Sequence, residues 1–240
     1  MVSEPIFRRV VLKFSGEVLG GERRNGIDRS VVEYLVDEIK SIKELGVQIG
    51  LVIGGGNFIR GISSADLGLS RITADYMGMI ATVMNALALR DFFRNAGIDA
   101  VVSSAIYMQD IAETVDIEKL KRKLDDGKVL IFAGGTGRPF VSTDTAAALR
   151  ACEFSADAII KGTKVEGLFD RDPEKYKGAK FIPDITYTNV LNRGLNVMDL
   201  TAFTMCQANR IPIIIYNMNK KGYLKRIILG EKLGSIIHGK

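Results

Sequence analysis

The sequence is poor in the side chains that build most catalytic triads and metal centres. Histidine occurs once, at His238, and tryptophan does not occur at all. The two cysteines, Cys152 and Cys206, lie far apart and form no CxxC motif. We therefore expect no histidine-based triad, no disulfide framework and no cysteine zinc site, and we interpret His238 as a solvated residue.

Long apolar runs are also missing. No uninterrupted apolar segment approaches the roughly 20 residues that cross a membrane, and the N-terminal region shows no leader-type apolar stretch. Its one apolar segment, residues 10–14, has the length of a strand and contains Lys13. These features predict a cytoplasmic protein with no membrane partner.

Charge of one sign is not concentrated in any part of the chain. The net charge of +5 results from 33 basic and 28 acidic residues, and the basic clusters are short. A nucleic-acid-binding protein usually gathers such an excess in runs or on one face, so a nucleic-acid partner is not expected. A modest positive excess also suits an enzyme whose substrates carry several negative charges.

The sequence does contain a regular alternation of strand and helix patterns. The predicted strands are residues 10–14, 47–53, 98–103, 128–133, 158–161, 168–170 and 212–216. The predicted helices are residues 71–96, 117–124, 143–153 and 200–209, and one that starts at Asp28 and carries Val31, Leu35, Ile39 and Ile42 on one stripe. No linker or repeat divides residues 1–240. The alternation predicts a single α/β domain, a three-layer sandwich whose mainly parallel central sheet is covered by helices on both faces.

The long helix predicted for residues 71–96 has a wide apolar stripe. Its members are Met77, Ile80, Ala81, Met84, Leu87 and Ala88. Most stripes of this kind belong to the core of their own chain. The alternative is a helix–helix interface between subunits, which the length of the stripe and its alanines also suit.

Four predicted strand ends are followed by glycine or hydroxyl residues, at 13–16, 54–57, 134–137 and 162–163. The carboxyl ends of parallel strands share one edge of the sheet, where ligands bind. Glycines there let backbone N–H groups approach an anion closely. The four turns together predict a polyphosphate or nucleotide site. The sequence contains no GxxxxGK[ST] motif, and the glycine run at 54–56 does not match GxGxxG, so neither a Walker A loop nor a dinucleotide cofactor is expected.

Two cations and one polar segment are the candidate chemical groups. Lys13 lies in an apolar strand, which is costly unless the ammonium meets an anion. It is a phosphate ligand, an edge-strand lysine, or a lysine whose side chain snorkels to solvent. Arg60 follows the glycine run and is either a bidentate phosphate ligand or a surface residue. Residues 136–144 place hydroxyls and an arginine at a helix start, which suits a phosphate pocket or an N-cap, and Asp144 could complement the helix dipole.

Together these motifs resemble a known family over essentially the whole chain. The matching stretches are VVLKFSGEVLGG, NGID, IGLVIGGGNFIRG, TADYMGMIATVMNALALRD, GGTGRPFVSTDTAAALRACE, KGTKVEGLFDRDP, LNVMDLTAF and IPIIIYNMNKKG. They are similar to those of bacterial uridylate kinases, in the amino acid kinase superfamily. The resemblance implies the amino acid kinase fold, phosphorylation of UMP to UDP by ATP with Mg²⁺, activation by GTP, inhibition by UTP, and a homohexamer. It does not identify the direct metal ligands.

The resemblance also implies a role for individual positions. The implied catalytic residues are Lys13, Arg60, Asp144 and Asp199. The implied ATP contacts are Lys13, Phe14, Ser15, Gly16, Gly56, Arg60, Thr163, Phe169 and Asp172. The implied UMP contacts are Gly55, Asp75, Thr136, Gly137, Arg138, Pro139, Phe140, Val141, Ser142 and Thr143. The implied GTP region is Gly21, Glu22, Arg23, Arg24, Asn25 and Gly26.

The chain departs from the family pattern in three places. Arg138 replaces the usual asparagine and could either contact a phosphate or turn to solvent. Glu166 stands where aspartate is common, and residues 22–25 are more charged than expected, so the GTP response is predicted less directly than catalysis. Three other interpretations remain open: a kinase of the same fold acting on a carbamate or carboxylate, a nucleotide-binding regulator or storage protein without turnover, and a secondary role in binding nucleic acid.

Overall fold

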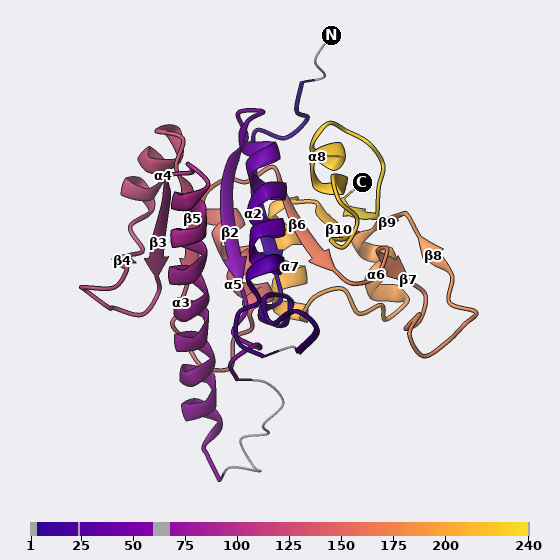
Figure 1. The fold of residues 1–240 in the computed structure, drawn as a ribbon. Coiled ribbons are helices and arrows are strands. Elements are labelled where there is room, and N and C mark those ends of the chain that lie inside the picture. Colours follow the sequence, from indigo (N-terminus) through magenta and orange to yellow (C-terminus); the bar gives the residue numbers. More distant parts are fainter. Residues whose placement is uncertain (1–3, 24, 60–67, 240) are drawn as a thin grey trace.

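The computed structural model describes residues 4–23, 25–59 and 68–239. Within these residues a nine-stranded sheet forms the centre, in the order β4-β3-β5-β2-β1-β6-β10-β11-β9 (Figure 1). Neighbouring strands from β4 through β10 are parallel, and β11 is antiparallel to β10. The strands are β1 Arg9–Phe14, β2 Gln48–Ile53, β3 Ala100–Ser104, β4 Glu113–Thr114, β5 Val129–Ala133, β6 Ala158–Thr163, β9 Asp184–Thr186, β10 Ile213–Asn217 and β11 Ser235–His238. A separate antiparallel pair joins β7 Leu168–Phe169 to β8 Phe181–Ile182.

Helices cover both faces of the sheet, as the alternating pattern predicts. One face carries α2 Arg29–Lys43, α3 Arg71–Asn95 and α8 Tyr223–Ile228, and α2 and α3 lie in front of the sheet in Figure 1. The other face carries α4 Ile117–Asp125, α5 Thr143–Glu153, α6 Tyr187–Asn192 and α7 Leu200–Asn209. The short helices α1 Gly16–Leu19 and η1 Gly21–Arg23 follow β1. The predicted three-layer sandwich with a mainly parallel sheet is confirmed.

Side chains alternate between the two faces along β1. Val10, Leu12 and Phe14 pack in the core beneath α2 and α3, whereas Val11 packs in the core beneath α5. Because side chains on a strand alternate with a period of two, Lys13 belongs to the same face as Val11. The strand thus directs its only charged interior side chain toward α5.

Local signals explain where α2 begins. Asp28 is the N-cap, and its carboxylate accepts hydrogen bonds from the backbone N–H groups of Ser30 and Val31 at 2.9 and 3.4 Å. This is the arrangement that a capping aspartate favours. The predicted stripe is confirmed at Leu35, Ile39 and Ile42, which are buried, but Val32 is buried in place of the predicted Val31.

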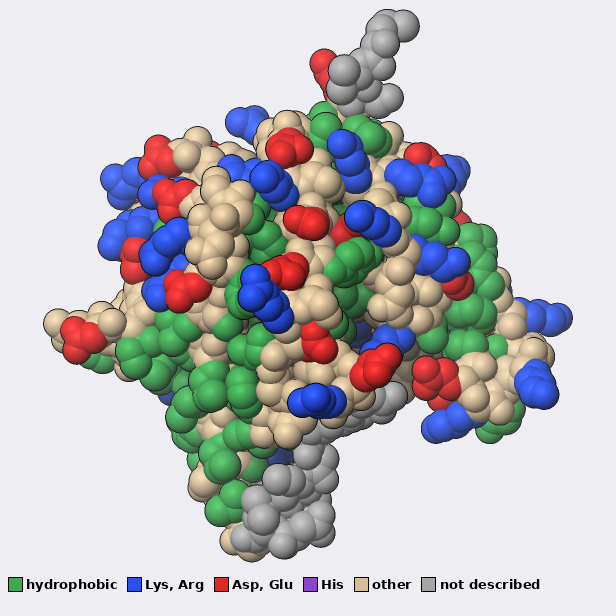
Figure 2. Space-filling view, viewed as in Figure 1, with side chains coloured by type: hydrophobic (Ala, Val, Ile, Leu, Met, Phe, Trp, Pro, Cys, Tyr) green, Lys and Arg blue, Asp and Glu red, His purple; other side chains and the backbone are tan. Residues whose placement is uncertain are grey.

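Helix α3 is confirmed, but its apolar stripe is not simply core. Ile80 and Met84 are each 46% exposed and Met77 is also exposed, whereas Ala81 is buried. Figure 2 shows hydrophobic side chains gathered on the surface over α3. The buried face consists of Met79, Ala81, Thr82, Val83, Asn85, Ala86, Leu89 and Phe93. By length and composition α3 would also suit a membrane span, but here it packs against β3 and β5 of the sheet.

Candidate functional site

The predicted glycine loops meet at the carboxyl edge of the sheet, where the strands β1, β2 and β5 end. Gly16, at the end of β1, lies so close to Gly54, at the end of β2, that a methyl group on Gly16 would collide with the carbonyl of Gly54. A methyl group on Gly55 would lie 2.6 Å from the carbonyl oxygen of Gly78 in α3. Both positions therefore need glycine for steric reasons, since a Cβ has no space there. The close approach holds the loops against each other and against α3.

A buried ion cluster lies beside these loops. Lys13 of β1 is paired in register with Lys161 of β6, and both lysines contact Asp144, in the first turn of α5. The Nζ of Lys13 lies 2.6 Å from Oδ1 of Asp144, and the Nζ of Lys161 lies 2.8 Å from Oδ2. Lys161 also donates to the carbonyl oxygen of Val197 at 2.8 Å. The edge-strand interpretation of Lys13 is wrong, because β1 lies between β2 and β6 and the residue is only 7% exposed.

The charges of the cluster compensate one another. Burial of the Asp144 carboxyl acts to raise its pKa, but the ammonium groups of Lys13 and Lys161 outweigh burial and hold the pKa below its usual value. Burial lowers the pKa of Lys161, and the nearby charge of Lys13 lowers it further. Two cations share one anion, so the cluster keeps a net positive charge next to the glycine loops. A site of this kind favours a phosphate group.

Asp199 joins the starts of two helices. Its carboxylate is the N-cap of α7 and accepts from the N–H of Ala202 at 3.0 Å. It also accepts from the hydroxyls of Thr145, at 2.8 Å, and Ser142, both at the start of α5. Burial acts to raise the pKa of Asp199, but the hydrogen bonds from Ser142 and Ala202 outweigh it, so the pKa is lowered. Ser142 is itself the N-cap of α5, which confirms the capping interpretation for this residue.

A cavity of about 510 Å³ has Thr143, the residue directly before Asp144 of the ion cluster, in its lining. Its size falls in the range of small-molecule sites. Of the sequence-predicted residues, it is lined by Gly55, Gly56, Asp75, Val141 and Thr143. The structure therefore brings together predicted contacts of both nucleotides, from the loop after β2, from α3 and from the segment before α5.

Asp75 holds the segment before α5 in place. Its carboxylate accepts two hydrogen bonds from Nε of Arg71, at 2.8 and 2.9 Å, and one from the N–H of Phe140 at 2.7 Å. Phe140 has a left-handed backbone, with φ of 67°, and the guanidinium of Arg71 lies 5.6 Å from the centre of its ring. A non-glycine residue in this region is strained, so the Asp75 contact stabilises an otherwise unfavourable loop conformation.

The other predicted residues of this segment differ in their surroundings. Arg138 is exposed, and Gly137 and Pro139 are partly buried. The Oγ1 of Thr136 is buried and has no hydrogen-bond partner among the described residues. A buried hydroxyl without a partner costs free energy unless a ligand or water supplies one. Thr136 is therefore a candidate ligand contact.

The predicted adenosine contacts lie on a different part of the structure. Thr163, at the end of β6, donates to the carbonyl oxygens of Val165 and Tyr216 at 2.9 and 3.2 Å. Phe169, on β7, packs edge-on against Phe181 with ring centres 5.5 Å apart, and Asp172 is exposed on the following turn. None of the three predicted contacts lines the 510 Å³ cavity. Their role in binding adenosine stays a prediction.

The predicted ATP contacts at the end of β1 differ in how accessible their side chains are to a ligand. Phe14 is fully buried in the core, so it could contact a nucleotide only through its backbone. Ser15 is the N-cap residue of α1, and its side chain does not cap that helix. Arg60, predicted as a phosphate ligand, lies outside the described residues, as does Arg24 of the predicted GTP region.

Gly26 of the predicted GTP region contacts the glycine loop after β2. Gly26 donates its N–H to the carbonyl oxygen of Asn57 at 2.9 Å, and Nδ2 of Asn57 donates to the carbonyl oxygen of Gly26 at 2.7 Å. Gly21 and Glu22 line a second cavity of about 620 Å³, whereas Arg23 and Asn25 are exposed. This region is therefore physically joined to the loop that carries Gly55 and Gly56.

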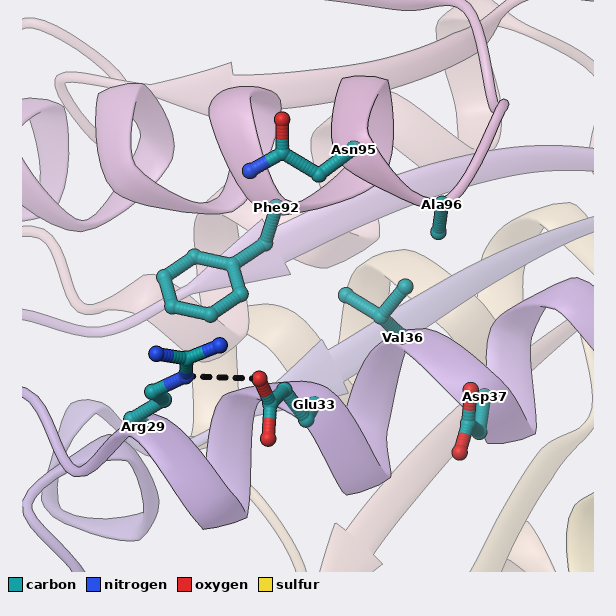
Figure 3. Close-up of a pocket in the computed structure, with 7 residues that line it drawn as sticks. All are labelled: Arg29, Glu33, Val36, Asp37, Phe92, Asn95 and Ala96. Atoms are coloured by element: carbon teal, nitrogen blue, oxygen red, sulfur yellow. Dashed lines mark hydrogen bonds and ion pairs between the residues drawn. The ribbon is translucent and has the colours of Figure 1, made fainter.

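A third cavity, of about 410 Å³, lies between α2 and α3 (Figure 3). Arg29 and Glu33 form an ion pair of 2.7 Å on one wall, and Phe92 and Asn95 project from α3 on the other. None of the sequence-predicted residues that the structure describes lines this cavity. The carboxyl edge of the sheet is therefore the better candidate site.

The chain is similar to known proteins over most of its length. The sequence profile of the amino acid kinase family matches residues 8–217. The chain belongs to the amino acid kinase family. Among solved structures it is similar to the UMP kinase of Bacillus anthracis, with 34% identity, a TM-score of 0.94, and coverage of 97% of this chain and 96% of that one. It is also similar to the UMP kinase of Ureaplasma parvum, with 33% identity, a TM-score of 0.90, and coverage of 96% of this chain and 98% of that one. The uridylate kinase of Archaeoglobus fulgidus is 26% identical, with a TM-score of 0.74 and coverage of 95% of this chain and 99% of that one.

Sequence reasoning missed four polar residues at the site of this amino acid kinase. They are Lys161, Arg71, Thr82 and Asn85. Lys161 could have been found in the same way as Lys13, because it is a charged residue that follows three apolar residues in the strand AIIKGT. Arg71, four residues before Asp75 on one helix face, could have been found from the spacing of an ion pair. Thr82 and Asn85 gave no signal, because their partners lie on loops far away in the sequence.

Proposed function

We propose that this amino acid kinase transfers the γ-phosphoryl group of ATP to the phosphate of UMP, giving UDP and ADP. The observation that carries the proposal is the cluster of Lys13, Asp144 and Lys161 at the sheet edge where the glycine loops and the 510 Å³ cavity meet. Solved UMP kinases at 33–34% identity over nearly the whole chain support the choice of substrates.

Positioning and neutralisation of charge dominate the proposed catalysis. The reaction brings two anions together in line, and it needs no strong base because the attacking phosphate oxygen is already ionised near neutral pH. Lys13 and Arg60 stabilise the transferring group, and Asp144 orients the ammonium of Lys13. Asp199 fixes Ser142 and Thr145 at the start of α5.

Magnesium enters this proposal as part of the MgATP substrate. Within the described residues no group of three or more His, Cys, Asp or Glu side chains is placed to hold a metal. Asp144 and Asp199 are nearby, but both carboxylates already have hydrogen-bonding or ionic partners. This donor set fits an ion held mainly by nucleotide phosphates and water, as Mg²⁺ prefers.

The UMP side of the proposed site is the cavity with Asp75 and the segment 136–143. Asp75 would receive the ribose hydroxyls, and the unpartnered hydroxyl of Thr136 would gain a hydrogen bond from the ligand. Arg138 is exposed, which is consistent with either phosphate contact or contact with solvent. Thr163, Phe169 and Asp172 would hold the adenosine of ATP.

Regulation and assembly extend the proposal. Activation by GTP through the region 21–26 is supported by the two hydrogen bonds between Gly26 and Asn57, next to the glycine run. Inhibition by UTP follows from the resemblance alone. The exposed apolar face of α3 supports a contact between subunits, and the proposed homohexamer follows from the resemblance alone. We place the enzyme in the cytoplasm.

The deciding experiment is a coupled assay of ADP release with MgATP and one acceptor at a time. The acceptors are UMP, CMP, dTMP, carbamate and acetylglutamate. Turnover with UMP and none with carbamate or acetylglutamate is the expected result, and the CMP arm measures specificity. Binding of ATP and UMP without turnover would instead support a regulator or storage protein.

A further inference from the structure

The buried face of α3 carries two polar side chains that the proposed mechanism does not use. Thr82 and Asn85 lie one turn apart, and they are 3% and 0% exposed. Polar groups of this kind are costly to bury unless their hydrogen bonds are made. Their partners therefore show what this helix face holds in place.

Thr82 holds the glycine loop after β5. Its hydroxyl accepts a hydrogen bond from the N–H of Gly134 at 2.8 Å and donates to the carbonyl oxygen of Met79 at 2.6 Å. Gly134 is the first residue after β5, has a φ of 72°, and begins the segment that leads to the proposed UMP contacts. The hydroxyl of Thr82 thus contacts backbone on both sides.

Asn85 holds the glycine loop after β2. Its Nδ2 donates to the carbonyl oxygen of Gly54 at 2.8 Å and to Oδ1 of Asn57 at 2.7 Å. Asn57, itself 1% exposed, donates back to Oδ1 of Asn85 at 2.8 Å and also bonds to Gly26. Every amide N–H of these two side chains has an acceptor, and a fully satisfied buried network of this kind is rigid.

We infer that Thr82 and Asn85 are positioning residues that set the spacing between the two phosphate-binding loops. Each contacts the first glycine of one loop, at Gly134 and Gly54, and both belong to one rigid helix. The tight contact of Gly55 with the backbone of α3 fixes the same spacing from a third point. The inference rests on the proposed function, since the spacing of the loops becomes the spacing of acceptor and donor phosphates.

The inference predicts different substrate effects for the two residues. Thr82→Val keeps the shape of the side chain but removes the bond to Gly134, so the KM for UMP should rise about tenfold while the KM for ATP changes less than twofold. Asn85→Asp removes both donors at the loop that carries Gly55 and Gly56, so the KM for ATP should rise about tenfold together with the KM for UMP.

Matched variants separate positioning from a general loss of stability. Thr82→Ser keeps the hydroxyl and should restore the KM for UMP to within twofold of the parent enzyme. Val83→Ala removes buried methyl groups from the same turn, so it should lower the melting temperature without changing either KM. If Thr82→Val and Val83→Ala have the same kinetic effects, or if Thr82→Val raises the KM for ATP as much as the KM for UMP, the inference is overturned.

Hydrogen exchange tests the inference without turnover. The N–H of Gly134 should be protected in the parent protein and in Thr82→Ser, and it should exchange at least tenfold faster in Thr82→Val. Unchanged protection in Thr82→Val would overturn the inference even if UMP is phosphorylated. Failure of the parent protein to phosphorylate UMP, with the expected exchange pattern intact, would overturn only the proposed function.

Discussion

Lys13 and Lys161 are register partners on adjacent parallel strands, and their ammonium groups contact the two oxygens of one carboxylate, that of Asp144. Two like charges at paired positions would repel each other without the anion between them. Asp144 therefore allows the sheet to keep two buried cations at the edge where phosphate is proposed to bind. Lys161, through its bond to Val197, also connects the cluster to the segment that leads into Asp199.

Removing the ammonium of Lys13 should mainly affect the chemical step. We expect Lys13→Ala to lower kcat by about 100-fold or more, the scale for losing a partner of transition-state charge. Steady-state kinetics with saturating UMP and MgATP measures this. Lys121→Ala, which removes a lysine paired with Glu118 on α4, is the control and should retain activity. A decrease below about threefold for Lys13→Ala would remove Lys13 from the catalytic set.

Variants that break the ion cluster should lower the free energy of unfolding, and the decrease should be larger when more buried charges are left unpaired. Asp144→Asn leaves two buried cations without an anion, and we expect it to lower the free energy of unfolding by about 3–5 kcal/mol. Lys161→Met leaves Asp144 paired with Lys13, so its effect should be smaller.

The double variant Asp144→Asn with Lys161→Met should be more stable than Asp144→Asn alone, because it removes one of the unpaired cations. Urea unfolding of the four proteins gives the coupling energy. Strictly additive effects would show that the two side chains do not interact.

The lowered pKa values of Asp144 and Asp199 predict how stability responds to acid. A carboxyl with a lowered pKa in the folded state stabilises the fold fully above its unfolded pKa, near 4, and this contribution is lost as the pH falls through the folded value. We therefore expect the free energy of unfolding to decrease below about pH 4, and to decrease less steeply in Asp199→Asn.

Activity should decline at a higher pH than stability does. Its acid limb should follow protonation of the acceptor phosphate, whose pKa is near 6 for a phosphate monoester. The profile of kcat/KM for UMP measures this, and Asp199→Asn should keep the same limb. A limb that moves in Asp199→Asn would assign it to the carboxyl group instead.

Asp75 should act on UMP and not on ATP. Asp75→Asn weakens the contacts to Arg71 and to the N–H of Phe140, and Phe140 has a strained left-handed backbone. We expect the KM for UMP to rise at least tenfold, about 1.4 kcal/mol of binding free energy, with little change in the KM for ATP. Isothermal titration with UMP alone provides a second measurement. Equal losses for both nucleotides would contradict the assignment of Asp75 to the UMP side.

The exposed face of α3 should hold subunits together. Replacing Ile80 and Met84 by glutamate places charges on a surface that is now apolar, so we expect the assembly to dissociate in light scattering. Leu191→Glu, on α6, changes a similarly exposed apolar residue elsewhere and should leave the mass unchanged. A monomeric mass for the parent protein at micromolar concentration would contradict the interface.

The elements that could be predicted from sequence are those with strong local signals. The bounds of α5 and α7 agree with the prediction, because Ser142 and Asp199 cap them and their side chains bond within the first turn. The short strands β4, β8, β9 and β11 were not predicted. Two to four residues carry no usable periodicity, so these strands depend on their pairing partners, which are β3 for β4, β10 for β11, β11 for β9 and the equally short β7 for β8.

The site could be predicted in part for a similar reason. A lysine inside an apolar strand requires an anion, so burial of Lys13 could be anticipated, but the identity of its partner could not. Asp144 reaches Lys13 across more than one hundred residues of chain, and only the strand order brings them together. The apolar stripe on α3 did not identify the buried face of this helix. The buried face contacts glycine loops, so a polar residue such as Asn85 is buried while Met84 is exposed.

Helix α3 has the loops on one side and an exposed apolar surface on the other, separated by one helix diameter of about 10 Å. A neighbouring subunit that covers Ile80 and Met84 would stabilise the same turns that carry Thr82 and Asn85. Association of subunits would then stabilise the loop geometry, and the fraction of protein in that geometry would depend on protein concentration by mass action. Protein concentration becomes a variable of catalysis, so specific activity should fall when the enzyme is diluted below the dissociation constant of this contact.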